Sequence, residues 1–112
     1  MPYGGGIHFD GARNGTATMF EIERLDDHTI ALRGRFDASQ ELDALEVFGQ
    51  VEGGLTVDFS ELRYVSSAGL GVLLATQKRL SGHGHAMRIV NVSPHIREVF
   101  ALAGFDRIFQ ME

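Results

Sequence analysis

The stretch LTVDFSELRYVSSAGLGVLLATQKRL occupies residues 55–80. Its first part, residues 55–60, alternates apolar and polar side chains, which is typical of a strand with one buried face. After a short polar passage, apolar residues recur at helical spacing, which predicts a helix from Ser67 to about Leu80. A strand therefore leads into a turn that presents two adjacent hydroxyl groups, those of Ser66 and Ser67, at the start of a helix.

The start of a helix has a chemistry of its own. Its first backbone N–H groups lack partners inside the helix, and the helix dipole places partial positive charge there. Serine is a good N-cap because its oxygen accepts a hydrogen bond from one of these groups. Ser66 and Ser67 could thus be one cap and one bystander. Alternatively one of them is modified, since a phosphate would be favourable beside free N–H groups.

Two glycines follow within the first turns of this helix. Gly69 and Gly71 each cost the helix about 1 kcal/mol relative to alanine. Close approach of a partner backbone, or tight packing of the helix on a neighbouring strand, would each explain them. The sequence alone leaves both explanations open.

Before this stretch, the chain predicts a hairpin and a helix. Alternating residues 18–24 and 29–34 flank an Asp-Asp-His turn. A helix over residues 37–50 follows, capped by Asp37 or Ser39. Its apolar face is expected along three positions: Leu42, Leu45 and Phe48 or Gly49.

After this stretch, residues 87–92 predict a further buried strand. Ser93 then caps a helix whose first position is Pro94, Gly104 ends that helix, and residues 108–111 form a short last strand. Alternating strands and helices with short links predict an α/β fold with parallel strands and right-handed crossovers. The initial hairpin makes the small sheet mixed, and about three helices pack with it.

Length and composition limit the classes of protein that fit. The 112 residues suit one domain, which we place at 16–112 after a flexible glycine-rich tail at 1–15. The chain has no cysteine, which fits a cytoplasmic protein, and no apolar run of membrane-spanning length. A formal net charge of −5 argues against a nucleic-acid binder, which needs a basic patch.

Catalytic and metal-binding motifs do not stand out. His83 and His85 have ligand-like spacing but lie in a glycine turn without further ligands, so we expect no metal and no cofactor. Ser67 lacks the Gly-x-Ser-x-Gly pattern of a hydrolase, so we expect no serine hydrolase. Phosphate-loop and dinucleotide-binding patterns are absent as well, and we expect that the protein is not an enzyme. Asp37 and Asp58 each end a predicted strand, where they serve either as caps or as part of a functional edge.

Four ordered segments together resemble the STAS domain family, in particular its stand-alone anti-sigma factor antagonists. They are DFSELRYVSSAGLGVL at 58–73, GRFD at 34–37, MRIVNVSP at 87–94 and VFALAGF at 99–105. The resemblance covers nearly the whole chain from Thr18 onward, and it implies the mixed α/β fold of that family.

The resemblance also implies a function. In the family, an anti-sigma factor that is often a serine kinase phosphorylates the serine at the start of the helix after the third strand, and a phosphatase resets it. Carried across, the phosphoacceptor is Ser67, with Ser66 as second choice, because Ser66 replaces the aspartate that many members have there. The partner-binding residues would be Asp37, Ser66, Ser67, Ala68, Gly69 and Gly71. The unmodified protein would bind the anti-sigma factor, and the phosphorylated protein would release it.

The resemblance to this family also allows a second functional hypothesis. STAS domains also serve as accessory subunits of transport or signalling complexes, where no phosphorylation switch is needed. The replacement of aspartate by Ser66 leaves room for that role.

Overall fold

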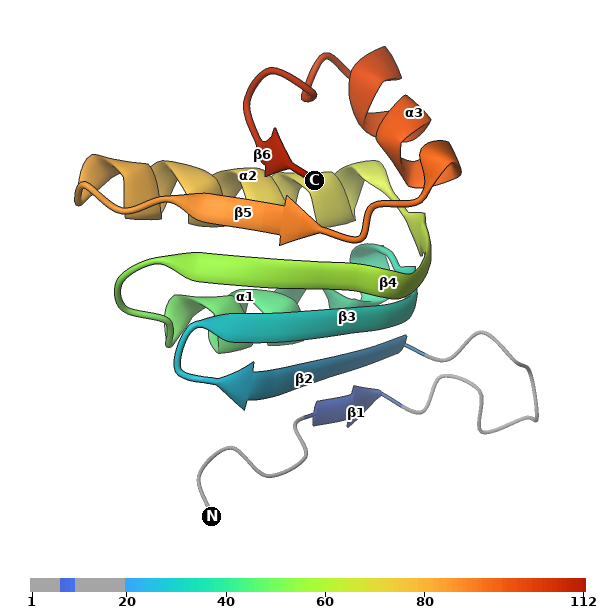
Figure 1. Ribbon diagram of the computed structural model, residues 1–112. Helices are drawn as coiled ribbons and strands as arrows, with labels where there is room; N and C mark the ends of the chain where they lie inside the picture. Colours follow the sequence, from blue (N-terminus) through green and yellow to red (C-terminus); the bar gives the residue numbers. More distant parts are fainter. Residues whose placement is uncertain (1–6, 10–19) are drawn as a thin grey trace.

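A six-stranded mixed sheet forms the centre of the protein (Figure 1). The computed structural model describes residues 7–9, as backbone only, and residues 20–112. The strands lie side by side in chain order; β1 and β2, and β2 and β3, are antiparallel, and the later neighbours are parallel. Their bounds are β1 Ile7–Phe9, β2 Phe20–Asp26, β3 Thr29–Phe36, β4 Leu55–Val65, β5 Met87–Val90 and β6 Gln110–Met111. The predicted mixed sheet with its initial hairpin is confirmed.

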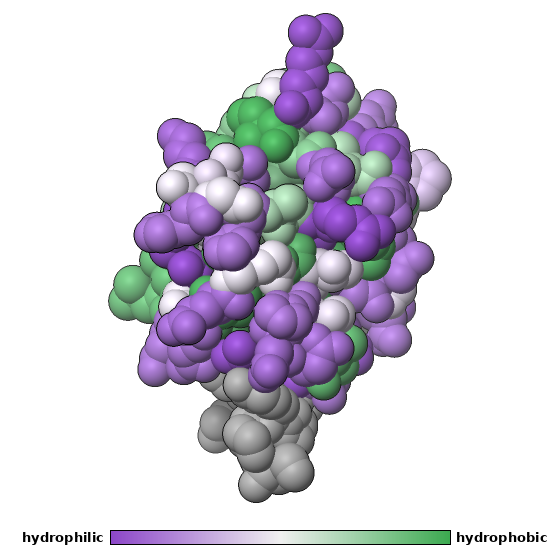
Figure 2. All heavy atoms as spheres, turned by 60° about the vertical axis from the view of Figure 1, so that its left-hand side comes forward, coloured by the Kyte–Doolittle hydropathy of each residue, from purple (hydrophilic) through white to green (hydrophobic). Residues whose placement is uncertain are grey.

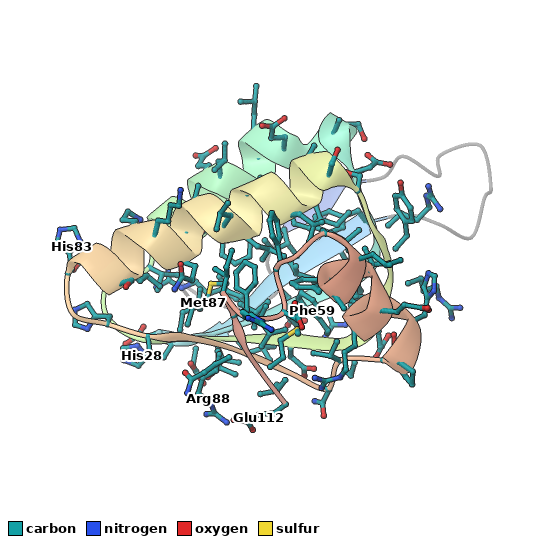
Figure 3. All side chains as sticks on the ribbon, turned by 90° about the horizontal axis from the view of Figure 1, so that it is seen from above. His28, Phe59, His83, Met87, Arg88 and Glu112 are labelled. Carbon is teal, nitrogen blue, oxygen red and sulfur yellow. The ribbon has the colours of Figure 1, made fainter. Side chains whose placement is uncertain are left out.

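The helices follow the parallel strands. They are the short 3-10 helix η1 (Ala38–Gln40), α1 (Glu41–Gly49), α2 (Ser67–Gly82) and α3 (Pro94–Leu102). Helices α1 and α2 lie side by side over one face of the sheet (Figures 1 and 3). Two successive crossovers between neighbouring parallel strands, each of the same hand, bring their helices to the same face.

Arg79 joins these two helices at one end. Its guanidinium donates to the carbonyl oxygen of Phe48, in the last turn of α1, at 2.8 Å, and to that of Val51, just after the helix, at 3.1 Å. The Phe48 carbonyl also accepts a hydrogen bond from the N–H of Val51 at 3.1 Å. A cation from α2 thus lies at the C-terminal end of α1, where the helix dipole favours positive charge.

Strand β4 is longer than the sequence pattern indicated. The polar passage with Glu61 and Arg63 belongs to the strand, which continues to Val65. The pairing of β3 with β4 shifts register twice, so extra residues are inserted in β4. Each shift returns an apolar side chain to the helix-covered face, where the buried residues are Leu55, Val57, Phe59, Leu62 and Val65.

The predicted apolar face of α1 is partly wrong. Leu42 is 81% exposed and Leu45 is 37% exposed, whereas Ala44, Val47 and Phe48 are buried. A nine-residue helix with leucines at one spacing and smaller apolar residues at another fits two alternative faces. The observed face keeps Phe48 of the predicted one and has Ala44 and Val47 in place of the two leucines.

The end of the chain follows the prediction. The Oγ of Ser93 accepts a hydrogen bond from the N–H of Ile96 at 3.2 Å, and Pro94 is the first residue of α3. Gly104 has a φ of +79°, a conformation that favours glycine after a helix. Phe100 anchors α3, because its ring centroid lies 6.0 Å from that of Phe59 and 5.4 Å from that of Phe109.

Strand β1 lies within the segment that the sequence analysis assigned to a tail. Residues 7–9 pair with β2, with Ile7 opposite Ile22 and Phe9 opposite Phe20, so a loose tail is wrong for these three residues. Residues 1–6 and 10–15 of that segment lie outside the described residues. The domain boundary at residue 16 stays a prediction.

The face of the sheet away from α1 and α2 is charged. Arg33 lies 2.8 Å from a carboxylate oxygen of Glu23, 3.4 Å from one of Glu21 and 4.0 Å from one of Glu61. The hydrogen bond to Glu23, and then the nearby carboxylates, outweigh burial and raise the pKa of Arg33. Near the β5–β6 edge of the sheet, the Nη2 of Arg88 lies 2.7 Å from the Oε2 of Glu112, and both side chains project from this face (Figure 3).

The molecule has two dissimilar ends along the parallel strands. The loops that precede β3, β4 and β5 gather at one end, which presents mostly hydrophilic residues (Figure 2). His28 and His83 both lie there (Figure 3). The opposite end holds the carboxyl ends of β3 and β4, and with them the turn from Val65 to Ser67.

Candidate functional site

Ser66 connects β4 to α2. It is the N-cap of α2 and has extended backbone angles, with φ −89° and ψ 174°. Its Oγ accepts a hydrogen bond from the N–H of Gly69 at 3.2 Å. Its own N–H donates to the carbonyl of Phe36 at 2.9 Å, which ties the turn to the end of β3. The Ser66 hydroxyl is therefore engaged in holding the helix start.

Ser67 is the first residue of α2 and lies in solvent. Within the described part of the chain, its hydroxyl makes no hydrogen bond, in contrast to that of Ser66. The two serines thus have different roles in the fold: Ser66 is the cap, and Ser67 leaves its hydroxyl exposed.

Asp37 follows β3 at the same edge of the sheet. It begins η1 as part of a capping box: its carboxylate accepts hydrogen bonds from the N–H of Ser39 at 3.0 Å and the hydroxyl of Ser39 at 2.7 Å. Its own N–H donates to the side chain of Gln40 at 2.9 Å. Since β3 and β4 pair up to Phe36 and Val65, Asp37 and Ser66 leave the sheet as neighbours.

Gly69 and Gly71 occupy different surroundings. A Cβ atom on Gly69 would lie 2.9 Å from a methyl carbon of Val65, 3.0 Å from the carbonyl oxygen of Phe36 and 3.1 Å from the Phe36 ring. Gly69 therefore lets α2 approach the sheet, which is the packing explanation. A Cβ on Gly71 would meet nothing within 4 Å, and Gly71 is exposed. Ala68, between Ser67 and Gly69, is half-buried.

Arg35 and Tyr64 form a contact that the sequence analysis missed. The Arg35 guanidinium carbon lies 4.0 Å from the centroid of the Tyr64 ring, a cation–π arrangement. The two residues are register partners at the ends of β3 and β4. No local pattern could have found this pair, because the register shifts in β4 determine which residue faces Arg35.

Asp58 does not end a strand, contrary to the prediction. It lies within β4, where its carboxylate accepts hydrogen bonds from the Asn91 side chain at 3.0 Å and the Ser60 N–H at 2.9 Å. Burial opposes ionisation of Asp58, but these hydrogen bonds outweigh it and lower its pKa. Asn91, which has a φ of +59°, is thereby fixed at the end of β5. Asp58 has a structural role as an acceptor.

Metal-ligating groups do not converge in the residues that the structure describes. Among them, no three His, Asp or Glu side chains lie close enough together to hold a metal ion. His83 and His85 lie at the end of the molecule opposite Ser67, and the Nδ1 of His83 is 2.9 Å from the carbonyl oxygen of Arg79. None of the described helices is both long and apolar enough to cross a membrane.

The fold and this corner define a small α/β domain that presents an exposed serine at the start of a helix. The chain belongs to the STAS domain family: the family model described as Mlab, STAS domain, matches residues 22–111. A STAS-domain protein of Pseudomonas aeruginosa is 31% identical over 86 residues, which are 74% of this chain and 85% of that protein. BtrV of Bordetella bronchiseptica, named as a candidate anti-sigma factor antagonist, is 35% identical over 94 residues, or 79% of this chain and 80% of BtrV.

Solved structures share the fold. The anti-sigma factor antagonist SpoIIAA in its unphosphorylated form superposes with a TM-score of 0.60 and 22% identity, covering 83% of this chain and 86% of that one. The STAS-like α/β fold predicted from the four sequence segments is therefore confirmed.

Proposed function

We propose that this protein is an anti-sigma factor antagonist whose binding is switched by phosphorylation of Ser67. The observation that carries the proposal is the division between the two serines. Ser66 caps α2, whereas the exposed Ser67 hydroxyl is free of hydrogen bonds to the described residues. A kinase can therefore modify Ser67 without removing the cap.

The relatives support this proposal. BtrV carries the name of a candidate anti-sigma factor antagonist, and SpoIIAA, which shares the fold, has been solved in both unphosphorylated and phosphorylated forms. These names describe regulatory binding proteins, which agrees with a protein that acts by binding and catalyses no reaction.

A phosphoryl group on Ser67 has a simple physical effect. It adds about −1.5 to −2 charges at pH 7 beside the first N–H groups of α2, where the helix dipole favours negative charge. The fold is therefore expected to tolerate it. A partner that packs against the neutral corner around Ala68 and Gly71 must instead bury a dianion, which is costly without a prepared counter-charge.

The proposed partner is an anti-sigma factor that is itself a serine kinase. The unmodified chain binds it and so releases a sigma factor, and a serine phosphatase restores the binding form. Asp37, Ser66, Ser67, Ala68, Gly69 and Gly71 form or support the binding corner in this proposal. The protein acts in the cytoplasm and needs neither a cofactor nor nucleic acid.

Phosphopeptide mapping of the protein from its native cells is the first test. We expect phosphate on Ser67. Binding of proteins from those cells to the immobilised chain is then compared between wild type and Ser67→Asp. We expect Ser67→Asp to weaken binding of the anti-sigma factor about a hundredfold or more, because a buried, unpaired charge costs several kcal/mol. Ser67→Ala should bind constitutively.

Three outcomes would count against this assignment. Phosphate on Ser66 would move the acceptor by one residue. No phosphate under any growth condition, together with full binding by Ser67→Asp, would remove the switch. Co-purification of an ATP-hydrolysing transport subunit in place of an anti-sigma factor would favour an accessory-subunit role.

A further inference from the structure

Two leucines of α1 are exposed to solvent, and one of them, Leu45, borders α2. Leu42 is 81% exposed and Leu45 is 37% exposed. Leaving large apolar side chains in water forgoes the stabilisation that burial would supply. Scattered single apolar residues are normal on surfaces, so the surroundings of this pair decide whether it has a meaning.

The neighbouring part of α2 is built from small residues. Leu45 and Gly49 of α1 line a shallow hollow of about 180 Å³ together with Ala75 and Thr76 of α2. The helices run side by side (Figure 3), so Leu42, about one turn before Leu45, lies level with the part of α2 about one turn before Ala75. That position is Gly71, where a Cβ would meet open space.

We call Leu42, Leu45, Gly71 and Ala75 the leucine surface. It begins one turn after Ser67 along α2 and extends toward Arg79. Gly71 costs α2 stability, and no packing contact inside the described chain requires it. The exposed leucines and the unexplained glycine therefore lie on the exposed side of the same pair of helices, near the proposed phosphoacceptor.

The charged side chains of α1 near the leucine surface are all acidic. Glu41, Asp43 and Glu46 are exposed on this helix, which carries no basic residue. Arg79, which lines the far end of the hollow, has its guanidinium bound to carbonyl oxygens of Phe48 and Val51. A complementary surface would have an apolar centre and basic side chains on the α1 side.

We propose that the leucine surface is a second part of the binding site for the anti-sigma factor, contacted by apolar side chains that basic residues flank. This inference rests on the proposed function, and it adds α1 to a site that the sequence placed at Asp37, the turn and the start of α2. Apolar burial at the leucine surface supplies affinity independent of Ser67. Phosphorylation of Ser67 then weakens binding at one edge of the interface, and the contacts that α1 makes with the partner are not altered directly.

The test uses the anti-sigma factor identified as the protein that wild type retains and Ser67→Asp does not. Its dissociation constant is measured with Leu42→Ser and with Leu102→Ser. Leu102 is a matched control, because it is 82% exposed but lies at the end of α3. We expect Leu42→Ser to weaken binding about tenfold or more, as loss of a buried leucine should, and Leu102→Ser to leave binding unchanged.

A second pair of measurements probes the charges. Glu46→Lys should slow association and reduce its dependence on salt, since exposed charges act mainly on the association rate. Circular dichroism and thermal unfolding should be nearly unchanged in all these variants, because the altered side chains are exposed.

The outcomes separate the two proposals. If Ser67→Asp abolishes binding while Leu42→Ser and Glu46→Lys bind as wild type does, the leucine surface is wrong and the phosphorylation switch stands. If Leu42→Ser and Leu102→Ser weaken binding equally, the surface is also overturned, because the effect is not local. If no protein is retained in a manner that depends on Ser67, the proposed function fails and this inference fails with it.

Discussion

The two sides of α2 differ in what constrains their residues. The side toward the sheet buries Leu70, Val72, Leu73, Thr76 and Leu80, and the side toward solvent carries Ser67, Gly71, Ala75 and Lys78. Each side has one glycine near the helix start. Packing against Phe36 and Val65 accounts for Gly69. No packing contact in the described chain accounts for Gly71. The two sides of α2 thus differ in that packing requires the glycine of one side and does not require that of the other.

Substitution of each glycine by alanine is the strongest test of this difference. Gly69→Ala should lower the free energy of unfolding by about 1–3 kcal/mol, because the new methyl group meets the Phe36 backbone and the Val65 side chain. Gly71→Ala should raise it by about 0.5–1 kcal/mol, since alanine is the better helix former. Chemical denaturation measures both changes. Equal effects of the two substitutions on the free energy of unfolding would contradict the different roles of Gly69 and Gly71.

The two serines provide the next test. Ser66→Ala should lower the free energy of unfolding by about 1 kcal/mol, because the N-cap hydrogen bond to Gly69 is lost. Ser67→Ala should change it by no more than about 0.5 kcal/mol, as expected for an exposed residue without partners among the described residues. Thermal or urea unfolding of the two variants gives the values. A loss in Ser67→Ala as large as that in Ser66→Ala would show that Ser67 has a structural role.

Thr76 provides the smallest effect, on the buried side. Its hydroxyl donates to the carbonyl of Val72 at 3.0 Å, a bond that a helix does not need, because that carbonyl already has a backbone partner one turn on. We expect Thr76→Val to keep the free energy of unfolding within about 1 kcal/mol of wild type. A larger loss would mean that the sheet-facing side of α2 depends on more than apolar volume.

Much of this fold follows from local patterns, and the exceptions have physical reasons. The hairpin, the Ser93–Pro94 helix start and the Gly104 helix end depend on neighbouring residues only, so the sequence predicts them. The side of α1 that is buried depends on how closely the sheet approaches, which local spacing cannot express. The length of β4 depends on register shifts against β3, and the pairing of β1 depends on a distant strand.

The candidate site also has features that depend on tertiary packing and that the sequence could not predict. The sequence predicted Ser66 and Ser67 at a helix start, and the structure shows that Ser66 is the cap and that Ser67 is exposed. The contact between Arg35 and Tyr64 and the exposure of Leu42 had no sequence signal, because both depend on tertiary packing.

The link made by Arg79 has a consequence for motion. It connects α2 to the C-terminal end of α1. Leu42 and Ser67, in contrast, lie near the N-terminal ends of α1 and α2. Fraying of helix ends is therefore opposed at one end of the pair more than at the other. Amide hydrogen exchange should be slowest in the last turn of α1 and faster near the helix starts. Binding of a partner at the helix starts would then be detected as slower amide exchange there, at the end of the helix pair away from Arg79.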